Sequence, residues 1–361
     1  MVETIIELDH HTHSRPVQAA LESFTAFYRQ KDSGWEHLAR PVYDLVDAAP
    51  DDYFFCASSA AEAVCQVIWS VFCEVSRKEG KTQFITSCIE DAPTLQMLKR
   101  CETLGCAIKV APVDADGRID IEKLAELITP RTALITVTAA HGLTGVIQPV
   151  EEIAKLAKEK GVLLHLDASY IIGKTYFSFQ SNSADYITFA GERIHSVKSG
   201  VLFSKKGRPI IPYIVGGEHQ AGLLSALSVA AHLANVALDT LGLEGARLRD
   251  LFETEIQKQL PEANILFQKT PRLPNTSAIL FPRIHAEALH YFLQRERLYP
   301  NTGGGYCQHL HKVLEFCQIG QNESVLSFSL SRMTTHSDMI RAATLICEKS
   351  KMLRKLTEDL F

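Results

Sequence analysis

Residues 163–174, LLHLDASYIIGK, and residues 184–207, ADYITFAGERIHSVKSGVLFSKKG, decide the fold of this 361-residue chain. Their short apolar runs are Leu163–Asp167, Tyr186–Ala190 and Gly200–Ser204. Runs of this length, rich in apolar and β-branched residues, are typical of buried strands. Asp167 ends the first run, and α/β sheets place ligand-binding groups at the carboxyl ends of their strands. The stretch therefore predicts a buried sheet with a candidate functional carboxylate at its edge.

The same alternation of strands and helices extends outward, from about residue 50 to residue 240. Further candidate strands are Tyr53–Cys56, Gln83–Thr86, Ala107–Ala111 and Ala133–Thr138. The candidate helices are Ala60–Glu74, Pro93–Leu104, Ile121–Ile128 and Val150–Lys158, with Asp120 as an N-cap and Gly80, Gly105 and Gly161 as C-terminal stops. Such βαβ units predict the α/β class, with a three-layer large domain around a mainly parallel seven-stranded sheet.

The pattern changes past Gly242. A long charged helix is expected over Glu244–Leu260, followed by a proline-containing bend at residues 270–277, TPRLPNTS, and further strands and helices. The chain is also longer than one hydrophobic core usually supports. We therefore expect an N-terminal arm over residues 1–15, a large domain over 16–243 and a small α+β C-terminal domain over 244–361.

Composition bounds the class of partner. The chain is 46% apolar and 22% charged, with a formal net charge of −5 and no block of like charges, so neither nucleic acid nor a membrane is an expected partner. Nine cysteines, with no Cys-x-x-Cys pair, favour reduced thiols over a disulfide framework or a four-thiolate zinc site. The start lacks a signal-peptide pattern, and no run reaches the roughly 18 apolar residues of a membrane span. We expect a cytoplasmic protein.

Several further segments occur in a defined order along the chain. They are LDHHTHSRP (8–16), FFCASSAAEAV (54–64), SCIEDAPTL (87–95), TAAHGLTGVIQP (138–149), GGEHQAGLLSAL (216–227), GGGYC (303–307) and SFSLSRMTTHSD (327–338). Together with the opening stretch they resemble the aminotransferase class V and cysteine desulfurase family, over nearly the whole chain. The resemblance implies the fold-type-I transferase fold, pyridoxal phosphate as cofactor, and a homodimer with cofactor sites at the subunit interface.

The resemblance assigns the central cofactor positions. Asp167 matches the aspartate that faces the cofactor's ring nitrogen; from the residues alone, an aspartate capping the next helix is an equal alternative. Glu192 and Arg193 stand where the family has histidine and the Schiff-base lysine. A guanidinium stays protonated and is not a useful amine nucleophile, so Arg193 is not expected to carry the cofactor. Lys198 is a candidate substitute, and Lys174 a weaker one.

Other cofactor contacts are also replaced. The family's phosphate-binding threonine and serine fall on Ala61 and Ala190, which removes two hydroxyl donors. The imidazole that stacks on the ring falls on Asp91, and the asparagine beside the ring oxygen falls on Gly142. The resemblance also places Tyr170 among the cofactor-binding positions. These changes predict weakened binding of both the phosphate and the ring.

The positions for substrate and partner subunit differ as well. The family's subunit-bridging arginine and threonine fall on Leu224 and Leu227, which predicts a more apolar dimer interface. The arginine that clamps the substrate carboxylate falls on Ser327, whereas Arg332 survives at a different family position. Losses at so many contacts together predict relaxed constraint on the whole cofactor site.

Cys307 follows three glycines in the loop Asn301–Tyr306. It matches the desulfurase loop whose thiolate attacks the sulfur of the bound substrate and leaves as a persulfide. Only the thiolate is nucleophilic, and His309 or His311 would lower the pKa of Cys307 if they approached it. The alternative is a loop cysteine with no chemical task.

Three histidines near the start form the other candidate cluster. His10, His11 and His13, with Asp9 beside them, could bind zinc or nickel. Clusters of this kind are more often surface imidazoles, so no metal site is predicted.

Three functions follow. The first hypothesis is a cysteine-desulfurase-like pseudoenzyme, a homodimeric scaffold that binds a protein or another small ligand in the old cleft. The second is an active desulfurase or lyase that uses Cys307 as sulfur acceptor, with Lys198 or non-covalently bound pyridoxal phosphate. The third is a sulfur-transfer or redox role at Cys307 without a cofactor.

Overall fold

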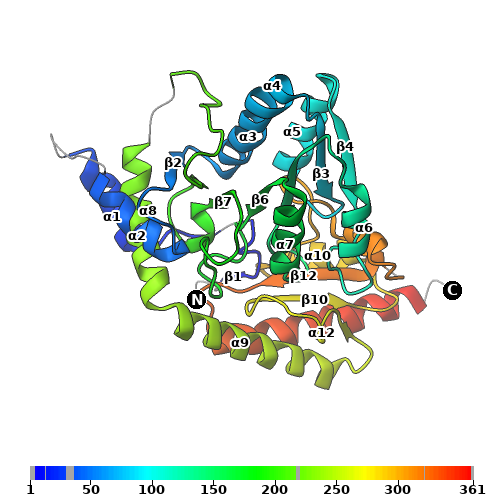
Figure 1. The fold of residues 1–361 in the computed structure, drawn as a ribbon. Helices are drawn as coiled ribbons and strands as arrows, with labels where there is room; N and C mark the ends of the chain where they lie inside the picture. Colours follow the sequence, from blue (N-terminus) through cyan, green and yellow to red (C-terminus); the bar gives the residue numbers. More distant parts are fainter. Residues whose placement is uncertain (1–4, 13, 30–35, 217–219, 321, 359–361) are drawn as a thin grey trace.

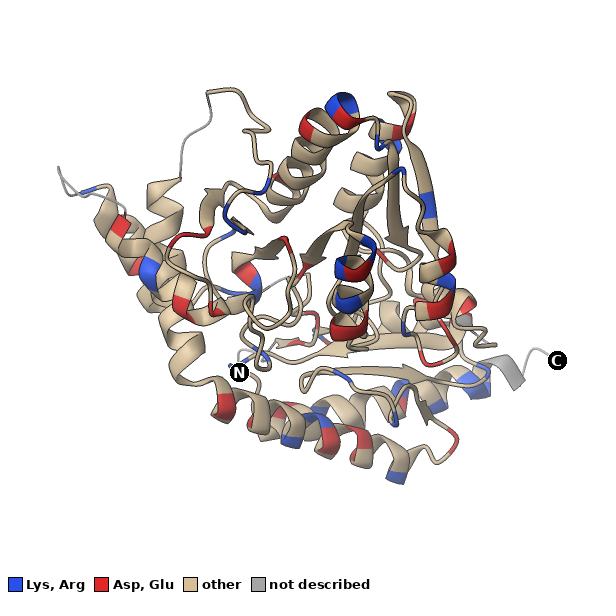
Figure 2. Cartoon of the chain, viewed as in Figure 1, with Lys and Arg blue, Asp and Glu red and all other residues tan. Residues whose placement is uncertain are grey.

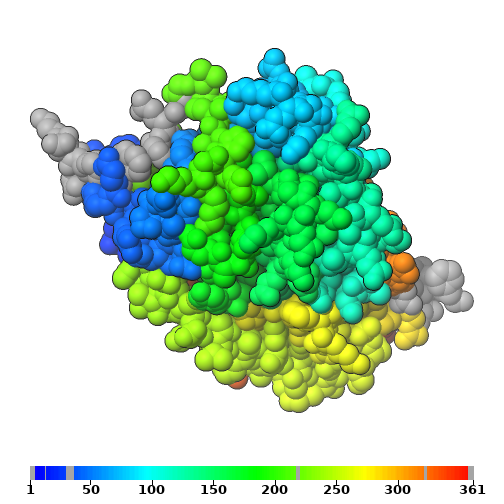
Figure 3. Space-filling model, in the orientation of Figure 1, coloured from blue at the N-terminus to red at the C-terminus, as the bar shows by residue number. Residues whose placement is uncertain are grey.

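A computed structural model describes residues 5–12, 14–29, 36–216, 220–320 and 322–358 of the chain. Figure 1 shows a large sheet-centred part above a smaller C-terminal part, along whose base the long helices α9 and α12 lie side by side. The space-filling view shows the C-terminal part packed directly beneath the large part (Figure 3).

The large part is built on a seven-stranded sheet. Its strands are β2 (Tyr53–Ala57), β3 (Gln83–Ser87), β4 (Ala107–Ala111), β5 (Thr132–Thr138), β6 (Leu163–Asp167), β7 (Tyr186–Ala190) and β8 (Gly200–Ser204). They lie in the order β2-β8-β7-β6-β5-β3-β4, and β8 alone runs antiparallel to its neighbours. The predicted mainly parallel seven-stranded sheet is confirmed.

Helices cover both faces of this sheet because successive side chains of its strands point to opposite sides. Phe55 and Leu134 join a core that includes α3 (Ala60–Val71) and α5 (Ala92–Thr103). Their neighbours Phe54 and Ile135 join the core on the other face. The helices of that face are α2 (Glu36–Val46), α6 (Ile121–Leu127), α7 (Val150–Lys160) and α8 (Ala221–Val236). The three-layer arrangement follows.

Helix ends agree with the predicted signals. The Asp120 carboxylate accepts a hydrogen bond from the Lys123 N–H and caps α6, and Gly161 ends α7 with a φ of 63°. The helix that starts at α3 continues through a π-helical turn, η1 (Phe72–Ser76), into α4 (Arg77–Glu79). The remaining helical elements are α1 (Gln18–Phe27), the 3-10 turns η2 (Gly191–Ile194) and η3 (Asn322–Ser324), α10 (Ala286–Arg295) and α11 (Leu310–Phe316).

The C-terminal part has its own core. Antiparallel strands β9 (Asn264–Ile265), β10 (Thr276–Leu280) and β12 (Val325–Ser329) pack against α9 (Leu238–Gln259), α10 and α12 (His336–Glu358). The N-terminal arm joins this part, because β1 (Ile6–Glu7) pairs with β11 (Leu298–Tyr299). Acidic and basic residues are interspersed along α7 and α9 (Figure 2).

Two expectations are corrected by the helices. The charged helix begins at Leu238 rather than Glu244, so α9 runs continuously through the expected start of the small domain. Leu224 and Leu227 are fully buried within this single chain, where α8 packs against α1 and α2. They belong to the core and not to an exposed interface.

Within the described part of the chain, no single helix has the length and hydropathy of a membrane span. The pair α8 and α9, bent by 73° at their junction, passes that test only when the two are taken together.

Candidate functional site

Asp167 lies at the carboxyl end of β6, as predicted, and is buried. Its Oδ1 accepts hydrogen bonds from the N–H and the hydroxyl of Ser169, at 3.0 and 2.6 Å. Burial raises the pKa of Asp167, and these hydrogen bonds and the charge of Arg193 oppose that shift. The carboxylate thus organises the turn after β6, and its position at the strand end is also the one that the family resemblance requires.

Tyr170 is the centre of the site. Its ring is only 3% exposed, and its hydroxyl donates to Oδ2 of Asp91 at 2.6 Å and lies 3.3 Å from Sγ of Cys307. The Arg193 guanidinium stacks over the ring at 4.8 Å from its centroid, and His11 meets the ring edge-on at 5.1 Å. Four predicted site residues, Asp91, Tyr170, Arg193 and Cys307, are therefore brought together in direct contact.

Gly142 makes room for Tyr170. A Cβ added at this position would lie 2.4 Å from a carbon of the Tyr170 ring, well inside van der Waals contact. The Tyr170 ring therefore fills the space that a side chain at position 142 would need, which is where the resemblance expects an asparagine. These two positions are therefore closely packed as part of the core.

The Arg193 side chain, which extends from η2, contacts both the Tyr170 ring and the N-terminal arm. Its side chain is 5% exposed and donates to the carbonyl oxygen of His10 at 3.5 Å, while its Nε has no hydrogen-bond partner among the described residues. The neighbouring Glu192 turns elsewhere, because its carboxylate accepts from the N–H of Ser199 at 3.4 Å. Lys198 is exposed, unlike the buried cluster around Tyr170. Lys198 therefore lies outside the cluster, whereas Lys174, the weaker substitute candidate, donates from its ammonium to the backbone carbonyl of Arg193 at 2.5 Å.

The N-terminus of α3 is the expected phosphate cup. Ala61 lies in its first turn without a hydroxyl, and the Glu62 carboxylate accepts from the N–H of Ser58 at 2.9 Å and from its hydroxyl at 2.5 Å. Ser59 is the N-cap of α3, because its hydroxyl accepts from the Glu62 N–H at 3.3 Å. The Glu62 carboxylate thus occupies the backbone and hydroxyl donors of Ser58. Sequence reasoning missed Glu62, although the Ser59-x-x-Glu62 spacing signals such a cap.

The loop that carries Cys307 is fastened over the site. The Tyr306 carbonyl accepts from the N–H of Ala92 at 2.9 Å, and the Gln308 amide donates to the carbonyl oxygens of Cys88 and Glu90 at 2.7 and 2.9 Å. Cys307 is 5% exposed, and burial, followed by the charge of Asp91, raises its pKa to about 12. At neutral pH the group is a thiol and not the nucleophilic thiolate.

The two loop histidines do not lower that pKa. His309 and His311 lie against each other with ring centroids 5.4 Å apart, whereas the groups that act on the Cys307 thiol are Asp91, Tyr170, Arg193 and Asp9. The expected activation by an imidazole is therefore absent among the described contacts of this loop.

Two acids of the site are buried together. Burial raises the pKa of Asp91 to about 7, against the hydrogen bond from Tyr170, and that of Glu90 to about 8. Glu90 accepts from the N–H of Thr138 at 3.0 Å and from the hydroxyl of Ser87. Glu90 was not predicted as a site residue, and its sequence signal is only a second acid after a strand.

The N-terminal histidines pack inside the molecule rather than on its surface. His11 bonds through Nε2 to the Thr276 hydroxyl at 2.6 Å, and burial keeps its pKa well below the usual value. His13 lies outside the described residues. Over the part of the chain that is described, no three metal-ligating side chains converge.

The substrate-clamp position is also occupied by a short side chain. Ser327 lies in β12 and donates to the carbonyl oxygen of Leu143 at 2.6 Å. A buried hydroxyl that is already bonded to the backbone offers no positive charge to a substrate carboxylate.

The fold, with Asp167 at the end of β6 and a glycine-rich cysteine loop across it, defines a protein of the fold-type-I transferase class. The Aminotransferase class-V family profile matches residues 23–221, more than half of the chain. The chain is 30% identical over 332 residues to a cysteine desulfurase of Cereibacter sphaeroides, which covers 88% of this chain and 85% of that one. It is 29% identical over 293 residues to a cysteine desulfurase of Nostoc sp., with 77% and 73% covered.

A solved structure named as a NifS-like protein superposes with a TM-score of 0.88 at 25% identity, and covers 97% of this chain and 100% of that chain. The chain belongs to the aminotransferase class-V family and is cysteine-desulfurase-like. Pyridoxal phosphate is the cofactor that this family membership implies.

The residues present do not fit that cofactor. At the position that the resemblance assigns to the lysine, Arg193 lies over Tyr170; Tyr170 fills the space beside Gly142, and the Glu62 carboxylate lies at the N-terminus of α3, the expected phosphate cup. Each is a feature of this chain's own packing, and of the expected cofactor contacts Asp167 keeps its place at the end of β6.

We predict that Gly142→Ala destabilises the protein by about 1–3 kcal/mol, because the new Cβ overlaps the Tyr170 ring. In a Tyr170→Ala background the same change has space and is expected to cost less than about 0.5 kcal/mol. Urea unfolding of the four proteins of this double-mutant cycle measures the difference.

Gly245→Ala is the matched control, because its added Cβ meets no atom closer than 3.6 Å and alanine favours the helix. Equal costs of Gly142→Ala in both backgrounds would contradict the contact.

Proposed function

We propose that this protein is a cysteine-desulfurase-like pseudoenzyme, which keeps the fold but does not carry out Schiff-base cofactor chemistry. The observation that carries the proposal is the buried contact of Arg193 with Tyr170, because it places a non-nucleophilic cation and a filled ring space where the cofactor would bind. The scaffold's role is then to bind a protein partner or another small ligand.

The alternative is an active desulfurase or lyase with Cys307 as sulfur acceptor. It needs an amine near Asp167 and a reactive thiolate. Lys198 is exposed, and Cys307 is a buried thiol whose pKa is raised to about 12. A sulfur-transfer or redox role at Cys307 without a cofactor would also need a thiolate, which the raised pKa of Cys307 disfavours. These observations favour the scaffold over both alternatives.

The borohydride test addresses the cofactor bond. We predict that protein purified in excess pyridoxal phosphate and then desalted has no visible absorbance and gains no mass after borohydride reduction, because no described lysine replaces Arg193. A cysteine desulfurase relative treated in parallel is the positive control. Spectra and peptide mass spectrometry make the measurement.

Arg193→Lys is the matched variant. It returns an amine to the position but leaves Tyr170 and Glu62 in place, so we expect it to remain free of cofactor too. A reduced adduct on Lys174 or Lys198 of the unaltered protein, with sulfide released from cysteine, would overturn the pseudoenzyme proposal.

We also propose that the protein is a cytoplasmic homodimer. The family resemblance supports this, as does the exposed apolar segment before α8, where Val215 is 95% exposed and Ile214 is 51% exposed. Light scattering is expected to give twice the 40.1 kDa of one chain. Val215→Glu is predicted to shift the protein toward monomer, whereas Leu104→Glu, at the exposed end of α5, is not; a monomer for the unaltered protein would contradict the proposal.

A further inference from the structure

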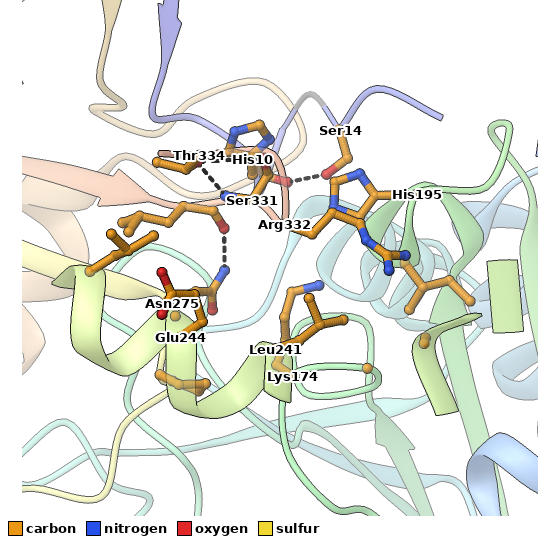
Figure 4. A pocket seen from close by; sticks show the side chains of 17 residues that line it. His10, Ser14, Lys174, His195, Leu241, Glu244, Asn275, Ser331, Arg332 and Thr334 are labelled. Atoms are coloured by element: carbon orange, nitrogen blue, oxygen red, sulfur yellow. Dashed lines mark hydrogen bonds between the residues drawn. The ribbon is translucent and has the colours of Figure 1, made fainter. Parts of the chain in front are cut away.

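A cavity lies on the other side of η2, the turn that carries Arg193, from Tyr170 (Figure 4). It measures about 70 Å³, is partly open to solvent, and is lined by residues of the N-terminal arm, the turn after β6, η2, α8, α9 and the segment after β12. Its polar lining residues are His10, Ser14, Lys174, His195, Glu244, Asn275, Ser331, Arg332 and Thr334. A cavity of this size holds several waters or a small ion.

Arg332 brings an uncompensated charge to this cavity. Its guanidinium makes no hydrogen bond or ion pair with any described residue, although the side chain is half-buried. Burial lowers the pKa of Arg332, and the group remains cationic at neutral pH. A partly desolvated guanidinium without a carboxylate has five donors available for an anion.

Lys174 faces the same space from the turn after β6. Its ammonium donates to the backbone carbonyl of Arg193 at 2.5 Å, so the lysine contacts the backbone of the residue whose side chain covers Tyr170. Figure 4 shows Lys174 and Arg332 reaching into the hollow from separate elements. Burial, and then the charges of Arg193 and Arg332, lower the pKa of Lys174 to about 7.

The other titratable groups around the cavity supply little compensation. His195 bonds through Nδ1 to the Arg15 carbonyl at 2.8 Å, and burial lowers its pKa to about 3, so the ring is neutral. At the rim, the Glu244 carboxylate accepts hydrogen bonds from Nε and from one terminal nitrogen, Nη2, of Arg247. After burial, the charges of Lys174, His10 and Arg332 also lower the pKa of His195.

One buried acceptor completes the lining. Asn275 is 5% exposed, and its Nδ2 donates to the carbonyl oxygen of Leu330 at 2.8 Å, while its Oδ1 has no hydrogen-bond partner among the described residues. This acceptor adds no donor for an anion; it would pair with the hydroxyl of a hydrogen phosphate but with no group on sulfate or a carboxylate.

We propose that this cavity is a binding site for a small oxyanion, a carboxylate or phosphate group, held by Arg332 and Lys174. The site is distinct from the cofactor position, because Arg193 separates the two: its side chain lies on Tyr170 and its carbonyl on Lys174. Nothing in this assignment depends on whether the protein is a pseudoenzyme.

Binding is coupled to a proton on Lys174. An anion beside this ammonium stabilises its charged form, so at pH 8, above the pKa of about 7, the lysine takes up a proton when the anion binds. The affinity for the anion therefore falls as the pH rises above about 7. His10, His195, Arg193, Arg332 and Glu244 are the other titratable groups that face this lysine or line its cavity.

Calorimetric titration with sodium sulfate tests the site, because sulfate carries no titrating proton of its own between pH 7 and 8. We expect one site per chain and, at pH 8 in buffers of different ionisation enthalpy, an uptake close to one proton. Arg332→Gln and Lys174→Gln are each expected to weaken binding about tenfold or more, and Lys174→Gln to abolish the proton uptake. Displacement by phosphate or by acetate then identifies the class of natural ligand.

Lys155→Gln is the charge-matched control, since Lys155 is exposed on α7, away from the cavity, and should leave sulfate binding unchanged. Arg332 lies in a half-exposed segment, so its variant is expected to fold even if Lys174→Gln does not. No sulfate binding, or binding that Arg332→Gln leaves unaltered, would overturn the assignment.

Discussion

The contact of the Arg193 guanidinium with the Tyr170 ring is the constraint on which the rest of the site depends. Tyr170 can lie there only because position 142 is glycine, and its hydroxyl then reaches both Asp91 and Cys307. Replacing Arg193 or Tyr170 would leave a buried polar group without its partner or a void, and any side chain at position 142 would overlap the Tyr170 ring. Gly142, Tyr170, Asp91, Arg193 and Cys307 therefore belong to one packed core.

The charges of this core also keep the Cys307 thiol protonated at neutral pH. Arg193 is a permanent cation beside Asp91 and Asp167, and burial raises the pKa of both acids and of the Cys307 thiol. A thiolate would add a further buried anion next to Asp91, so the proton stays on sulfur. The same turn connects this core to the cationic cavity, because the backbone carbonyl of Arg193 accepts the Lys174 ammonium.

The sheet could be predicted from the sequence because each strand alternates between two cores, as Phe54 and Phe55 do. The end of β6 at Asp167 followed from the same pattern. The site could be predicted only as a set of positions, since the fit of Tyr170 against Gly142 is a tertiary contact without a local signal. Leu224 was misplaced for a similar reason: its burial comes from the packing of α8 on α1 and α2.

The most direct test of this account is a crystal structure of the protein grown in saturating pyridoxal phosphate. The account predicts the Arg193 guanidinium over the Tyr170 ring, the Tyr170 hydroxyl on Asp91, and no cofactor density against Asp167. A pyridine ring bound at Asp167, with Tyr170 displaced from Gly142 and the phosphate at the N-terminus of α3, would contradict it.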